Sequence, residues 1–72
     1  MKVTIERTSS NPANTTLAVY KGGTRPIAYI YEEDFFDMLP ERQFELAQQG
    51  KTEFNVPANE LMTRSKQYFT NN

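Results

Sequence analysis

The sequence contains no cysteine, no histidine and no tryptophan among its 72 residues. Without cysteine, a disulfide framework, a zinc knuckle and a thiol nucleophile are all excluded. Without histidine, a Ser-His triad and an imidazole-based zinc site are excluded, and no side chain ordinarily titrates near neutral pH. These absences remove most of the familiar catalytic and metal centres from consideration.

The sequence also lacks a strong charge of either sign and a long apolar run. Nine acidic and eight basic side chains leave a formal net charge of −1, which argues against a protein that holds duplex nucleic acid mainly through its phosphates. The first residues alternate apolar and polar side chains and carry charge, unlike a signal peptide, and no apolar run approaches membrane-spanning length. We therefore expect a cytoplasmic protein that makes no membrane contact.

The length allows one domain, spanning residues 1–72. Hydrophobic residues make up only 38% of the chain, but aromatic residues reach 12%, which is typical of a folded domain rather than a disordered chain. A single core of this size rarely supplies more than about 3–5 kcal/mol of net stability. Self-association, most simply as a homodimer, is therefore expected. Within the domain, we also expect a flexible loop at 8–16 and a frayed tail at 70–72.

Alternation of apolar and polar residues predicts a strand around Val3 and Ile5, and a hairpin formed by residues 17–21 and 27–31. The paired glycines Gly22 and Gly23 suit its turn. Loops of two and four residues place the same side chains together, because their registers differ by two. One face then carries Leu17, Val19, Ala28 and Ile30, and the other carries Ala18, Tyr20, Ile27, Tyr29 and Tyr31.

Both faces of this hairpin are too apolar for open water. We therefore expect the hairpin to be covered on both sides or to stack against a partner.

Residues 33–49 have a helical pattern that Pro40 interrupts, and Gly50 suits the position after the helix end. Residues 51–56 alternate as a strand, and Pro57 then opens a final helix. The apolar positions assigned to that helix are Ala58, Leu61, Met62, Ser65, Tyr68 and Phe69. The predicted fold is a two-layer α+β domain in the order β-β-β-α-β-α, with a small, mainly antiparallel sheet packed by two helices.

Acidic residues concentrate in one stretch, because residues 32–45 carry six acids and one base. Four of the acids recur at intervals of four, and like charges at that spacing do not stabilise a helix. The row has three interpretations: a solvated helix face, a contact for a basic protein partner, or a divalent-cation site, although calcium sites usually add loop carbonyls and a turn glycine. Its members are Glu33, Asp37, Glu41 and Glu45.

Three tyrosines, Tyr20, Tyr29 and Tyr31, share one predicted hairpin face, with Arg25 and Arg7 expected nearby. Core packing beneath the helices, a protein or self interface, and stacking of unpaired bases all use such rings. The last option would also use Lys21, but no RNP-type motif accompanies the tyrosines.

The remaining features do not indicate catalysis or a cofactor. A phosphate loop needs a helix after its glycines, and here a strand follows Gly22 and Gly23. A chain this short has little volume for a cleft with paired carboxylates. The sequence therefore predicts a non-enzymatic protein-interaction or regulatory module, with a single-stranded nucleic-acid-binding protein as the alternative.

Overall fold

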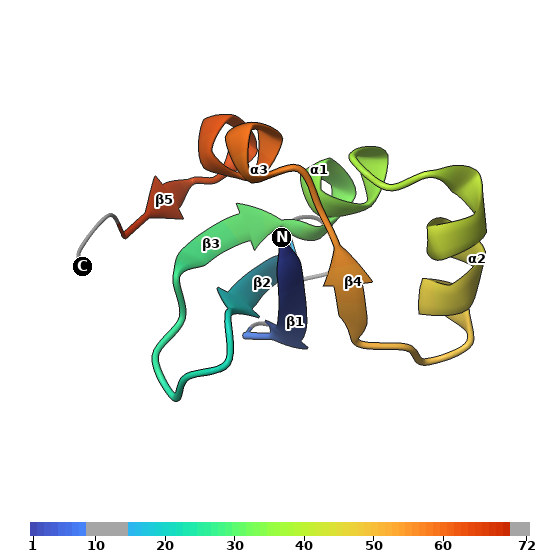
Figure 1. The fold of residues 1–72 in the computed structure, drawn as a ribbon, viewed down its shortest axis with the longest axis horizontal. Coiled ribbons are helices and arrows are strands. Elements are labelled where there is room, and N and C mark those ends of the chain that lie inside the picture. Colours follow the sequence, from blue (N-terminus) through green and yellow to red (C-terminus); the bar gives the residue numbers. More distant parts are fainter. Residues whose placement is uncertain (9–14, 70–72) are drawn as a thin grey trace.

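A computed structural model describes residues 1–8 and 15–69 of the chain (Figure 1). They form a small α+β fold, as the sequence predicts. The elements in chain order are β1 (Lys2–Arg7), β2 (Thr16–Tyr20), β3 (Ala28–Tyr31), α1 (Glu32–Asp37), α2 (Glu41–Gln48), β4 (Glu53–Asn55), α3 (Ala58–Arg64) and β5 (Gln67–Tyr68). The loop expected at 8–16 lies mostly outside the described residues, as does the tail at 70–72. At the loop's ends, Thr8 donates its backbone N–H to the carbonyl of Thr16.

The described strands form one antiparallel sheet in the order β4-β1-β2-β3-β5. In the predicted hairpin, Val19 pairs with Ala28, which is the register of a four-residue turn. Gly22 has a φ of +80°, which glycine adopts without strain. The hairpin is therefore confirmed, and so are its facing sets with the exception of Ile27. Ile27 packs against the core rather than among the tyrosines, because it precedes the paired residues of β3 and donates its N–H to the carbonyl of Val19.

The core lies between one face of this sheet and the helices. The hairpin supplies its buried residues Leu17, Val19, Ala28 and Ile30, and the flanking strands add Val3 and Phe54. The helices and the segments next to them contribute Phe35, Met38, Leu39, Val56 and Leu61. In Figure 1, α1 and α3 lie together along the top of the sheet, and α2 stands beyond β4 at the right.

Pro40 divides the helical stretch as predicted. The segment α1 ends at Asp37, and α2 begins at Glu41 directly after Pro40, whose ψ of 153° is extended. Proline has no N–H to donate and a fixed φ, so it fits just before a helix but not inside one. Gly50 has a φ of +98° and follows the C-cap of α2, in agreement with its predicted role.

The prediction of one long helix after Pro57 is wrong at its second half. The helix α3 ends at Arg64, and Ser65 is already extended with a ψ of 144°. Tyr68 lies in β5, the edge strand that pairs with β3, and Phe69 follows it directly. Phe69 donates its backbone N–H to the carbonyl of Ile27. The adjacent pair Tyr68 and Phe69 does not alternate as a strand would, so the pairing with β3 rather than the sequence pattern decides the conformation here. Met62, expected in the core, lies within α3 but is 50% exposed, and Leu61 is the buried residue of this helix.

Candidate functional site

The sheet face that points away from the core carries the three predicted tyrosines, and we call it the open face. It is defined by the outward side chains of the four strands β1, β2, β3 and β5 and of the residue after β5. They are Lys2, Thr4, Glu6, Thr16, Ala18, Tyr20, Tyr29, Tyr31, Gln67 and Phe69. Tyr20 and Tyr29 are half-buried, whereas Tyr31 is 37% and Phe69 40% exposed. The face therefore presents aromatic surface to the outside.

Ala18 lies in the middle of this face and is almost completely buried. It is absent from the cluster that forms the core on the other side of the sheet. Its neighbours across the strands are the much longer Glu6 and Tyr29. These longer side chains close over Ala18, so the outer surface at this point is formed by its neighbours.

The carboxylate of Glu6 lies next to the ring of Tyr20 on the open face. The Tyr20 hydroxyl donates to Oε1 of Glu6 at 3.2 Å. Desolvation of the hydroxyl, the hydrogen bond and the negative charge of Glu6 all raise the pKa of Tyr20 above the ordinary value of 10.0. Tyr20 thus stays a neutral donor at physiological pH, and Glu6 keeps a fixed position on the face.

The cation Lys66 lies over the ring of Tyr31 on the open face. The Lys66 ammonium lies 4.4 Å from the centroid of the Tyr31 ring and donates to Oγ1 of Thr16 at 3.2 Å. Both partners are uncharged. The positive charge of Lys66 is therefore held in place over the open face without being neutralised there.

Phe69 extends the aromatic surface onto the edge of the sheet. Its ring packs edge to face against Tyr29, with centroids 5.8 Å apart and planes at 79°. Phe69 and Lys66 were not predicted as members of this face, because the sequence pattern placed them in a helix. Residues 66–69 are two polar residues followed by two aromatic ones, so no alternation marks this segment as a strand.

The predicted cations of this face are only partly near it. Lys21 and Arg25 lie exposed at the hairpin turn. Arg7 pairs with Leu17 in the sheet register, on the core side of the sheet, and its guanidinium forms an ion pair with Glu32. The expectation that Arg7 stands among the tyrosines is therefore wrong, because the register turns it to the opposite face.

The predicted acidic row is not one continuous helix face. Glu33 and Asp37 belong to α1, and Glu41 and Glu45 to α2, with the break at Pro40 between them. All four are exposed. Asp37 accepts a hydrogen bond from Nη1 of Arg64 at 2.8 Å, which ties α1 to α3. This acid therefore has a structural partner within the chain.

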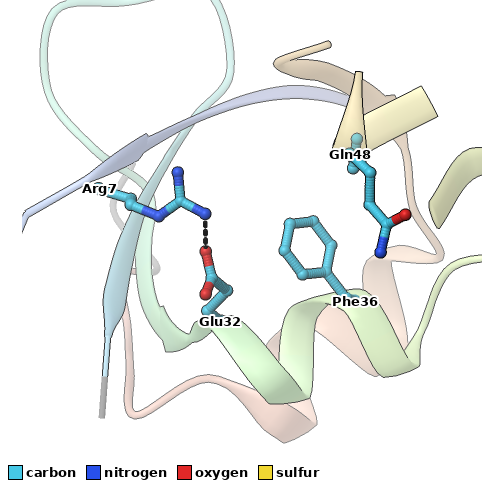
Figure 2. A pocket seen from close by; sticks show the side chains of 5 residues that line it. Arg7, Glu32, Phe36 and Gln48 are labelled. Carbon is cyan, nitrogen blue, oxygen red and sulfur yellow. Dashed lines mark ion pairs between the residues drawn. The ribbon is translucent and has the colours of Figure 1, made fainter. Parts of the chain in front are cut away.

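A cleft of about 260 Å³ opens between β1, α1 and α2, and sequence reasoning did not predict it (Figure 2). The ion pair of Arg7 with Glu32 lies on one side, and Phe36, Ala47 and Gln48 line the other. Because the ion pair already balances its own charge, the cleft offers a ligand no net charge. Within residues 1–8 and 15–69, no cluster of three or more acidic side chains is arranged to hold a metal ion.

Comparisons with protein-family models, with curated proteins and with solved structures found no match for this chain. Across the part of the chain that the structure describes, no helix has the length and apolar character needed to cross a bilayer.

Proposed function

We propose that this chain is a small, non-enzymatic protein-binding module that contacts its partner through the open face. The observation that carries the proposal is the grouping of Tyr20, Tyr29, Tyr31 and Phe69 on the sheet side away from the core. Tyrosine and phenylalanine bring a large contact area at low entropic cost, and interfaces are enriched in aromatic residues. The helices cover the other apolar face of the hairpin, so association through the open face is the remaining way to cover its rings.

The charges of the open face favour a protein partner over single-stranded nucleic acid. Stacking of bases on a sheet needs cations that follow the phosphates. Here the Glu6 carboxylate is fixed beside Tyr20, and Glu53 on the neighbouring strand adds another acid next to Lys2. A mixture of both charge signs with aromatic rings suits a protein surface better than a polyanion.

The sheet edges favour contact through the face rather than through strand addition. The two edge strands β4 and β5 contain three and two residues. Edges this short offer few backbone groups to an added strand. A partner therefore gains more contact from the side chains of the open face.

Hydroxyl-radical footprinting of the dilute protein tests whether this face is available. The rings of Tyr29, Tyr31 and Phe69 should react much faster than the buried rings of Phe35 and Phe54. Protection of the open-face rings in a dilute monomer would show that the chain covers its own face and would overturn the proposal.

A titration with a short single-stranded oligonucleotide at low salt tests the alternative. We expect no saturable change in tyrosine fluorescence. Salt-sensitive quenching, in contrast, would identify a base-stacking surface and replace the protein-binding proposal. The proposal also keeps the cytoplasmic location expected from the sequence, which fractionation of expressing cells would test.

A further inference from the structure

We infer that the partner of the open face is a second copy of this chain, packed face to face about a two-fold axis over Ala18, with Glu6 of each copy facing Lys66 of the other. This inference rests on the proposed function, because it identifies the protein that the open face binds. It is carried by the arrangement of charge and of exposed aromatic rings on that face.

The open face is self-complementary in charge. Glu6 lies on β1 beside Ala18 and is oriented by the Tyr20 hydroxyl, whereas the Lys66 ammonium lies over Thr16 and Tyr31. Among residues 1–8 and 15–69, neither Glu6 nor Lys66 forms an ion pair. A two-fold rotation places the same patch opposite itself, so an axis between these two charges brings each against its opposite in the second copy.

The aromatic rings of the open face surround the proposed axis. Between the positions of Glu6 and Lys66 the sheet carries the small, buried Ala18, flanked by the rings of Tyr29 and Tyr31. Because the longer neighbours already close over Ala18, two copies meet through the rings around it, and each copy covers the exposed rings of Tyr31 and Phe69 of the other. The side chains of packed sheets interdigitate, with strands crossing at about 30°.

The energetics of a small domain point in the same direction. A core of this size supplies little net stability, and association is one of the few available additions in a chain that has no cysteine. A second copy is always present at the concentration of the first, and its charges match without any further assumption about another protein.

A charge exchange between two variants tests this pairing. We expect sedimentation equilibrium to show a dimer for the unaltered chain in the micromolar to millimolar range. Glu6→Lys and Lys66→Glu, studied singly, should each weaken dimerisation by at least about tenfold, because like charges then meet across the axis twice. An equimolar mixture of the two variants should recover a heterodimer, since each lysine then faces a glutamate again.

Matched controls carry the same charge changes away from the open face. Glu45→Lys on α2 and Lys51→Glu in the loop after α2 both alter exposed residues, so they should leave the dimer within about twofold of the unaltered chain. Circular dichroism of each variant establishes that the fold is retained, and recovery in the mixture excludes unfolding as the cause of dissociation.

Two results would overturn the inference. If both charge changes leave the dimerisation affinity unaltered, or if the mixture fails to restore a dimer, Glu6 and Lys66 do not face each other. A chain that stays monomeric at millimolar concentration would remove the second copy as partner. In that case footprinting still decides the proposed function, because an open face that reacts freely in the monomer remains available to a different protein.

Discussion

Tyr29 and Phe69 pack edge to face across the β3 side of the sheet, with their ring centroids 5.8 Å apart. The contact joins the hairpin to the residue that follows the last strand, far away in the sequence. It holds Phe69 on the open face together with the backbone hydrogen bond to Ile27. The aromatic surface of the proposed interface therefore depends on how the end of the described chain docks.

Replacing Phe69 by alanine should weaken this docking. Edge-to-face pairs contribute about 0.5–1.5 kcal/mol beyond the area they bury, so urea denaturation should show a loss of about 1 kcal/mol. Met62→Ala is a suitable control, because Met62 is also exposed but lies on α3. Equal losses for the two variants would argue that the Tyr29 contact adds nothing specific.

The neighbouring glycines of the hairpin turn should respond in opposite ways to alanine. Gly22 has a φ of +80°, and a side chain there is strained by roughly 1–2 kcal/mol. Gly23 has no positive φ, and an added Cβ would come no closer than 4.0 Å to another residue. Gly23→Ala should therefore be neutral or stabilise the fold by about 0.4–1 kcal/mol.

Thermal unfolding of the two variants measures this difference directly. Because the substitutions are adjacent and chemically identical, they differ only in the backbone conformation that the turn requires. Equal effects at both positions would contradict the four-residue turn with Gly22 in the left-handed region.

The raised pKa of Tyr20 should make the fold sensitive to alkali. Desolvation and the Glu6 carboxylate favour the protonated hydroxyl, so the pKa is higher in the folded than in the unfolded chain. The resulting stabilisation is complete below pH 10.0, the ordinary tyrosine value. It is lost as the pH rises from there through the folded pKa, because the unfolded chain gives up its proton first.

Denaturation at a series of alkaline pH values tests this sign. The stability of the unaltered chain should fall more steeply above pH 10.0 than that of Tyr20→Phe, which has no proton to lose at this position. In Glu6→Gln the phenolate absorbance of one tyrosine should appear at lower pH than in the unaltered chain. Superimposable pH profiles for the unaltered chain and Tyr20→Phe would refute the assignment.

Two ion pairs of β1 should differ in their contribution to stability. Arg7 pairs with Glu32, whose side chain is only 26% exposed, whereas Lys2 and Glu53 lie 3.9 Å apart and are both well exposed. Arg7→Met leaves a partly buried carboxylate without its partner and should cost about 1–3 kcal/mol. Lys2→Met should cost about 0–0.5 kcal/mol, because exposed pairs contribute little.

Chemical denaturation with and without added salt separates the two cases. Salt screens the exposed pair, so the small effect of Lys2→Met should vanish at high ionic strength, whereas that of Arg7→Met should largely persist. A larger loss for Lys2→Met than for Arg7→Met would contradict the burial of Glu32.

The sequence by itself determined the features that depend on neighbours in the chain. Alternation around Gly22 and Gly23 predicted the hairpin and which of its side chains share a face, apart from Ile27 next to the turn, because the two-residue period of a strand and the turn geometry are local. Pro40 and Gly50 marked the limits of α2 for the same reason, since missing N–H groups and positive φ angles are properties of single residues.

Only the tertiary structure decided which face the helices cover and where the chain ends its last helix. Both hairpin faces are apolar, so nothing local distinguishes the face of Leu17 from that of Tyr29. The segment after Arg64 does not alternate as a strand would, and the free backbone edge of β3 selects the strand. That long-range pairing also brings Lys66 and Phe69 to the tyrosines, because hydrogen bonds between distant segments depend on the whole fold rather than on sequence spacing.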